Sequence, residues 1–210
     1  MSEVFEVDAP DELPLNAAEE ALAAGEAVVF PTDTVYGLAG RPDIPGATDR
    51  LFEMKQRPRD LTLPLLAAGP EDASGVAVFD DRAWALSGPF WPGGLTMVLP
   101  RTSRALAWDL GAEAETVGVR VPDHAVARAL LARTGPLAVT SANRSGDPTP
   151  STCSGVRESL GELVAVYLCS GEASGIVPST VVDLTGAETR VLREGSVGPD
   201  AILDVLRGAM

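Results

Sequence analysis

Lys55 and Arg57 lie two positions apart at the end of a predicted helix, and they are the first candidates for chemistry. Lys55 is the only lysine of the chain, and the other fifteen strong bases are arginines. Two cations at this spacing suit a triphosphate or a carboxylate, with the ammonium acting as a point charge and the guanidinium as a planar fork. The same pair could instead compensate the negative end of the helix dipole. No Walker-type loop is present, so a phosphate site here would be built from side chains.

Arg120 is a candidate for another reason, because it stands within the apolar stretch Val117-Gly118-Val119-Arg120-Val121. A charge in such a strand is costly unless it is paired. We therefore expect Arg120 to face either an anionic ligand or an internal carboxylate, and the sequence leaves both open.

Hydroxyl-bearing residues lie at the ends of three predicted strands, where they could bind a polar ligand or form ordinary turns. The three clusters, with the basic residue that follows the last of them, are Thr32-Asp33-Thr34, Thr140-Ser141-Ala142-Asn143, Ser179-Thr180 and Arg193. Donors and acceptors gathered at strand ends are typical of a binding site on a sheet.

Composition limits the class of protein. The 210 residues carry a formal net charge of −14, which argues against stable, sequence-independent nucleic-acid binding, although an anionic small substrate stays possible where arginines converge. The single histidine, His124, excludes a histidine-rich metal site and is expected in a surface or capping role. Cys153 and Cys169 fit no metal-ligand spacing and are expected to be small buried thiols in a reducing compartment. With neither a signal segment nor an apolar run of about 18 residues, we expect a cytoplasmic protein without a membrane span.

Short strands alternating with helices must position these residues. Apolar spacing predicts helices over residues 15–24 and 47–55, a third capped by Asp123 and a fourth over 200–207. Strands are predicted at 27–30, 62–67, 95–99, 117–121, 137–140, 164–168, 180–184 and 189–192. The pattern indicates one α/β (α+β) domain over residues 1–210, with a motif-bearing core of about 15–195 and a mixed sheet that is antiparallel near residues 183–189.

The ordered set of motifs resembles the YrdC/Sua5 family, the threonylcarbamoyl-AMP synthases of tRNA modification. The matching stretches are PTDTVYGL, KQRP, WPGGLT, VGVRVPDH, TSANRSG, PSTVVDL and LREG, between residues 30 and 195. The length is similar to the short, single-domain form of the family (TsaC type). The resemblance implies a twisted, open mixed sheet flanked by helices, with a concave, positively charged cavity.

The resemblance also implies a reaction, in which L-threonine, bicarbonate and ATP give threonylcarbamoyl-AMP and pyrophosphate. Lys55 and Arg57 would be catalytic. ATP would be bound by Lys55, Arg57, Thr116, Ser141, Asn143 and Arg193. Threonine would be bound by Thr34, Arg120, Ser141 and Ser179. Mg²⁺ would enter with ATP and have no direct protein ligand.

A downstream transferase complex would pass the threonylcarbamoyl group to adenosine 37 of ANN-decoding tRNAs, so tRNA is an indirect partner. Two alternatives stay open: a YrdC-like domain that forms another carbamoyl-adenylate, and a non-catalytic RNA-binding module. The net charge of −14 argues against the second.

Overall fold

The computed structural model describes residues 1–112, 114–171 and 177–208. Its core is a ten-stranded mixed sheet with the strand order β1-β8-β2-β3-β7-β4-β6-β5-β9-β10. The strands are β1 (Glu3–Glu6), β2 (Val28–Phe30), β3 (Gly37–Gly40), β4 (Leu65–Leu66), β5 (Leu95–Pro100), β6 (Thr116–Arg120), β7 (Leu137–Ser141), β8 (Val166–Cys169), β9 (Thr180–Asp183) and β10 (Arg190–Arg193).

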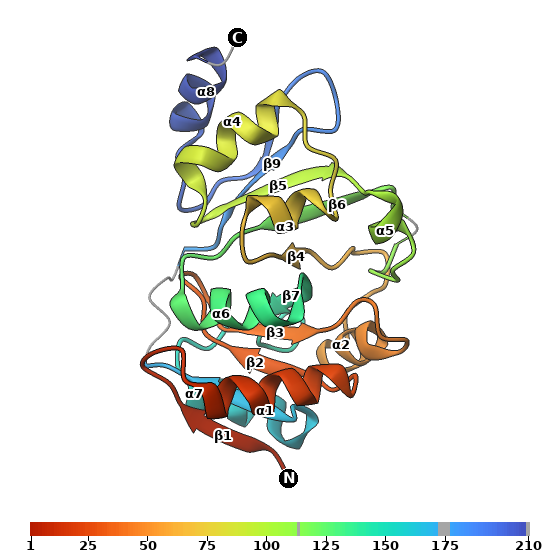
Figure 1. The fold of residues 1–210 in the computed structure, drawn as a ribbon, viewed down its shortest axis with the longest axis vertical. Helices are drawn as coiled ribbons and strands as arrows, with labels where there is room; N and C mark the ends of the chain where they lie inside the picture. The colour runs from red at the N-terminus through yellow and green to blue at the C-terminus, as the bar shows by residue number, and fades with distance from the viewer. Residues whose placement is uncertain (113, 172–176, 209–210) are drawn as a thin grey trace.

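Helices flank this sheet, and Figure 1 shows α1 and α6 over its lower part and α3 and α4 over its upper part. The helices are α1 (Glu12–Ala23), α2 (Ala47–Lys55), α3 (Pro70–Ser74), α4 (Asp81–Phe90), α5 (Ser103–Leu106), α6 (Ala125–Thr134), α7 (Cys153–Leu160), the 3₁₀ helix η1 (Gly161–Leu163) and α8 (Pro199–Gly208). The first strand, β1, and the last helix, α8, lie at opposite ends of the molecule (Figure 1). None of the described helices is long and apolar enough to cross a membrane.

The sheet contains both parallel and antiparallel pairs, which confirms the predicted mixed sheet flanked by helices. The β1–β8, β2–β8, β4–β6 and β5–β9 pairs are parallel, and the other pairs are antiparallel. The return predicted near residues 183–189 is the antiparallel β9–β10 pair.

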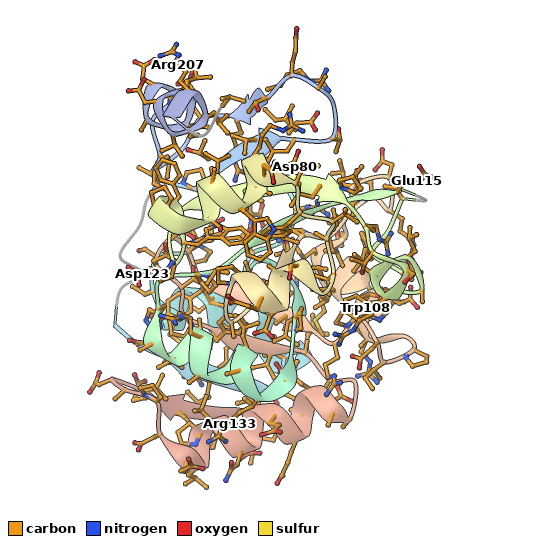
Figure 2. The ribbon with its side chains drawn as sticks, turned by 45° about the horizontal axis from the view of Figure 1, so that its top comes forward. Asp80, Trp108, Glu115, Asp123, Arg133 and Arg207 are labelled. Atoms are coloured by element: carbon orange, nitrogen blue, oxygen red, sulfur yellow. A yellow bond between two sulfur atoms is a disulfide. The ribbon has the colours of Figure 1, made fainter. Side chains whose placement is uncertain are left out.

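Two hydrophobic clusters lie on opposite faces of the sheet, because successive residues of a strand point to opposite sides. In β2, Val28 and Phe30 belong to the cluster with α1 and α6, whereas Val29 belongs to the cluster with α2, α4, α7 and α8. Arg133 connects α6 to α1, donating to Asn16 at 2.7 Å and pairing with Glu12 at 2.9 Å (Figure 2). Because α1 and α6 cover only part of their face, the rest of that face is open to form a cavity.

Three local predictions were wrong. The strand expected over residues 62–67 is only Leu65–Leu66, since Pro64 has no N–H to donate and Leu63 bonds to the carbonyl of Leu110 instead. The residue before α6 is His124, not Asp123, and it makes no side-chain cap; the backbone N–H of Asp123 donates to Asp33 at 3.0 Å.

The cysteines form the third correction. Cys153 and Cys169 are buried, as expected, but they form a disulfide instead of remaining free thiols. The reason is tertiary: α7 packs against β8 and brings the two Cα atoms to 5.4 Å, a distance within disulfide range. The cysteines therefore no longer support the expectation of a reducing compartment.

Candidate functional site

A cavity of about 550 Å³ opens on the uncovered part of the α1 and α6 face. Leu66 and Val139 belong both to the cavity wall and to the hydrophobic cluster under α6, which places the two side by side on one face. Arg57, Arg120 and Arg193 line this cavity, and no carboxylate does among the described residues. The cavity is thus a positive site in a chain of net charge −14.

Strand alternation determines which side chains reach the cavity. In β6, Thr116, Gly118 and Arg120 lie on the cavity side, whereas Val117 and Val119 pack into the opposite cluster. Neighbouring strands agree with this register: Thr96 of β5 lies opposite Val181 of β9, and both line the cavity. The alternating pattern of the sequence therefore places Thr116 and Arg120 on one polar wall.

Arg120 is buried in this wall, and each of its three guanidinium nitrogens donates one hydrogen bond within the protein. Its Nη2 donates to a carboxylate oxygen of Asp33, its Nη1 to the hydroxyl of Thr34 at 2.8 Å, and its Nε to the carbonyl of Gly93 at 2.9 Å. Burial lowers the pKa of Arg120 while Asp33 opposes that shift, and a guanidinium stays charged under both influences. Of the two alternatives, the internal carboxylate is present as Asp33. Arg120 also lines the cavity, so an anionic ligand stays a prediction.

Arg193 reaches the cavity through an irregularity in β10. Val191 lies opposite Val182, but Arg193, not Leu192, lies opposite Val181, so Leu192 is an extra residue in the strand. A bulge of one residue moves the following side chain to the other face. Val181 lines the cavity, so Arg193 now does too, and its guanidinium donates to the carbonyl of Ser179 at 2.8 Å and to the hydroxyl of Ser179 at 3.1 Å.

Gly195 permits this arrangement, because a Cβ built there would lie 2.2 Å from the carbonyl oxygen of Pro178. The LREG stretch can therefore pack directly on the backbone beside Ser179. In turn, the hydroxyl of Ser179 contacts that of Thr96 at 2.8 Å. Sequence reasoning missed Thr96, although its position in the strand after WPGG, alternating with Leu95 and Met97, was a usable signal.

The end of α2 separates Lys55 from Arg57, although only Gln56 lies between them in the sequence. Gln56 has a left-handed φ of 52°, and the chain turns there. Arg57 then lies in the cavity wall, where its guanidinium makes only long contacts, at 3.4 Å and 3.5 Å, to the carbonyls of Leu61 and Thr62. Arg57 is therefore the cavity arginine with the weakest internal hydrogen bonds.

Lys55 points away from the cavity wall into the turn that follows β7. Its Nζ donates to the carbonyl of Ser141 at 2.6 Å, to the carbonyl of Asn143 at 2.7 Å and to the amide oxygen of Asn143 at 3.0 Å. Burial, with a smaller contribution from Arg57, lowers the pKa of Lys55 to about 8. The lysine stays mostly protonated at neutral pH, yet it is only 2% exposed.

The cavity brings most of the predicted site residues together. Those that line it are Thr34, Arg57, Thr116, Arg120, Ser141, Ser179 and Arg193. Lys55 and Asn143 lie directly behind Ser141, whose hydroxyl donates to the amide oxygen of Asn143 at 2.6 Å. His124 precedes α6 outside the cavity lining, with its Nδ1 buried and without a partner among the described residues.

Asp33 is the residue whose role the sequence indicated least. Its carboxylate accepts from Arg120 and from the backbone of Asp123, so it ties the loop after β2 to the loop after β6. The motif Thr32-Asp33-Thr34 was singled out as a unit, but only Thr34 was selected as a binding residue. The signal that could have identified Asp33 was the need of Arg120 for a carboxylate.

The described cavity lining has no carboxylate to ligate a divalent cation directly. Its described lining residues offer hydroxyls and carbonyls but no aspartate or glutamate, and the described chain holds no cluster of three potential metal-ligating side chains. Mg²⁺ that is already bound to a nucleotide fits this set, because it keeps phosphate and water ligands.

Comparison with known proteins identifies the family. A sequence profile of the Sua5/YciO/YrdC family, described as telomere recombination, matches residues 20–195. A Mycobacterium leprae protein provisionally named threonylcarbamoyl-AMP synthase is 42% identical over 209 residues, covering 98% of this chain and 94% of its own length. The threonylcarbamoyl-AMP synthase of Bacillus subtilis is 37% identical and is matched over 95% of this chain and 60% of its own.

Solved structures agree with this family. Pyrococcus abyssi Sua5 complexed with L-threonine superimposes with a TM-score of 0.87 at 33% identity, covering 98% of this chain. This chain spans 60% of the length of that protein. Escherichia coli YciO superimposes with a TM-score of 0.85 at 28% identity, covering 94% of this chain and 98% of its own.

Proposed function

We propose, from the premise that this chain belongs to the Sua5/YciO/YrdC family, that it is an L-threonylcarbamoyladenylate synthase and thus a nucleotidyltransferase. The observation that carries the proposal is a cavity lined by three arginines, several hydroxyls and no described carboxylate, in a chain of net charge −14. Such a site selects a small, multiply charged anion and not a polyanionic surface. ATP together with the carboxylate of threonine meets that description.

The reaction needs little covalent help from the protein. The amine of threonine takes up carbon dioxide to form a carbamate, a carbamate oxygen then attacks the α-phosphorus of ATP, and pyrophosphate leaves. Negative charge accumulates on both reactants, so positioning and electrostatic stabilisation supply the rate enhancement. Mg²⁺ bound to the phosphates would neutralise part of that charge.

The cavity residues are assigned two roles, one toward threonine and one toward ATP. Arg120 keeps two of its five N–H donors after its three internal hydrogen bonds, and two donors suit a bidentate grip on the threonine carboxylate. Thr34 and Ser179 contact Arg120 and Arg193, so their hydroxyls are suited to hold threonine nearby.

Arg57 and Arg193 are suited to the phosphates, with Thr116, Ser141 and Asn143 on the nucleotide side. Arg57 has the most freedom to turn toward a ligand, since its internal contacts are long. Lys55 contributes beside Ser141 and Asn143. The product would pass to a downstream transferase complex and then to adenosine 37 of tRNA, with all steps in the cytoplasm.

Pyrophosphate release from ATP and bicarbonate tests this function, measured with L-threonine and, as a control, with L-serine. We expect release that depends on threonine, and a loss of about 100-fold or more in Arg57→Ala, the size of a lost charge-assisted contact of about 3 kcal/mol. Arg128→Ala is the matched control, because Arg128 lies exposed on α6 outside the cavity lining. A folded protein that binds ATP but releases no pyrophosphate with threonine would contradict the proposal and point to another carbamoyl acceptor.

A further inference from the structure

The contacts of Lys55 leave its ammonium no donor for a ligand. An ammonium carries three N–H donors. Three short hydrogen bonds, of 2.6, 2.7 and 3.0 Å, already connect it to oxygens of Ser141 and Asn143. A phosphate could bind Lys55 directly only if one of these bonds were broken inside a buried site, which is expensive.

Lys55 binds the turn after β7 through both its side chain and its backbone. While the ammonium donates to Ser141 and Asn143, the backbone carbonyl of Lys55 accepts from the N–H of Ser145 at 2.9 Å. The turn is further fixed by Asn143, whose amide nitrogen donates to the carbonyls of Arg144 and Asp147 at 2.9 and 2.7 Å. One residue at the end of α2 therefore determines the path of the chain from Ser141 to Ser145.

Lys55 also keeps its positive charge unneutralised. All of its hydrogen-bond partners are neutral oxygens, and the only charged group that affects its pKa is Arg57, another cation. A charge surrounded by neutral dipoles still acts at a distance of a few ångströms in a site of low dielectric. The anion bound in front of Ser141 would experience that field without touching Lys55.

We propose that Lys55 is a positioning residue, which acts on the bound nucleotide through the 141–145 turn and not as a direct phosphate ligand. This inference rests on the proposed function for its effect on turnover, but the contact with the turn belongs to the substrate-free protein. The sole lysine at the end of α2 and the Ser-Ala-Asn turn then form one functional unit, although 86 residues separate Lys55 from Ser141.

Hydrogen exchange of the substrate-free protein tests the first half of the proposal. Lys55→Met should increase the exchange of amides between residues 142 and 147 by at least about tenfold, because the acceptors of Ser141 and Asn143 lose their donor. Arg57→Ala is the matched control, since it removes the neighbouring cation without touching the turn, and it should leave that exchange unchanged. Lys55→Gln, which keeps one amide donor, replaces Lys55→Met if circular dichroism shows that the methionine variant does not fold.

A double-mutant cycle on pyrophosphate release tests the second half. If Lys55 acts through the turn, the losses in kcat/KM caused by Lys55→Met and by Asn143→Ala should not multiply. The double variant should lose about as much kcat/KM as the worse single variant. The losses in kcat/KM caused by Lys55→Met and by Arg57→Ala should multiply, because Arg57 acts independently of the turn, from the cavity wall.

Unchanged exchange in the turn, or losses that multiply between Lys55 and Asn143, would overturn the proposal. Absence of threonine-dependent release in the wild-type protein would instead refute the proposed function. The exchange measurement uses no substrate and is unaffected by that outcome, so the two failures are distinguishable.

Discussion

Arg120 and Lys55 are both buried cations beside one cavity, yet their surroundings differ in a way that defines what each can do. Arg120 pairs with the carboxylate of Asp33, so much of its charge is balanced, but two of its five donors stay available. Lys55 is surrounded by neutral oxygens, so its charge persists, but all three of its donors are used.

The two residues therefore separate two properties that a basic residue usually combines, namely directed hydrogen bonding and positive charge. Arg120 offers direction, because a planar fork held by three bonds presents its remaining donors at fixed angles. Lys55 supplies a positive charge and fixes the turn after β7, but it has no donor left to contact a ligand. A binding site that must hold both a carboxylate and several phosphates benefits from having both kinds of cation.

The strongest test of this contrast is Arg120→Ala. It removes the available fork and leaves Asp33 without its partner, so kcat/KM for threonine should fall about 100-fold or more, whereas KM for ATP should change by less than about threefold. Steady-state kinetics with each substrate varied in turn measures the split. A variant that is less stable but, where still folded, has unchanged apparent affinity for threonine would show that Arg120 serves the fold alone.

Titration of Lys55 should produce the next largest effect, on stability. Its pKa in the folded protein, about 8, lies below the usual value for lysine of about 10.4 in an unfolded chain. Between these two values the unfolded chain binds more protons, so the free energy of unfolding rises with pH. From about pH 7 to about pH 10 the wild-type protein should gain about 2 kcal/mol relative to Lys55→Met.

Urea denaturation of both proteins across this range measures that gain. Arg120→Ala is the comparison variant, because a guanidinium keeps its charge throughout the range and its removal should not change the pH dependence. An identical pH dependence in wild type and Lys55→Met would mean that Lys55 is not buried as described.

Asp33→Asn should give the smallest effect. Asparagine keeps an oxygen that can accept from Arg120 and from the backbone of Asp123, so only the ion pair is lost. We expect KM for threonine to rise about fivefold, corresponding to about 1 kcal/mol, with kcat nearly unchanged. An effect as large as that of Arg120→Ala would mean that Asp33 contacts the substrate itself.

The sequence predicted the elements that follow from local pattern and missed those that depend on distant partners. The apolar residues around Arg120 predicted a strand and an anion or carboxylate facing the guanidinium, and the structure has the strand and the carboxylate of Asp33. The helix α4 was missed because Pro89 lies within it. No local signal could show that Lys55 would meet Asn143, since that contact depends on how α2 docks beside β7.

The mixed sheet could be predicted from the pattern of strands and helices, and the residues of the cavity from their match to the family motifs. The disulfide could not, because it depends on α7 lying against β8, and α7 carries no strong periodic signal in its few residues. The placement of Arg193 was expected from the motif, but its cause, an extra residue in β10, is visible only in the register of the pair.

That extra residue also has a consequence for how this strand can change over generations. The side chain of Leu192 is 58% exposed, so many substitutions there should be harmless. The pairing of the strand is another matter, because regular pairing of the same residues would place Leu192 opposite Val181 and turn Arg193 from the cavity to the opposite face. Deletion of Leu192 would leave Arg193 opposite Val181 by regular pairing, so Arg193 would stay on the cavity side. The strand should therefore tolerate substitution or loss of Leu192, but not loss of the bulge while its length is kept.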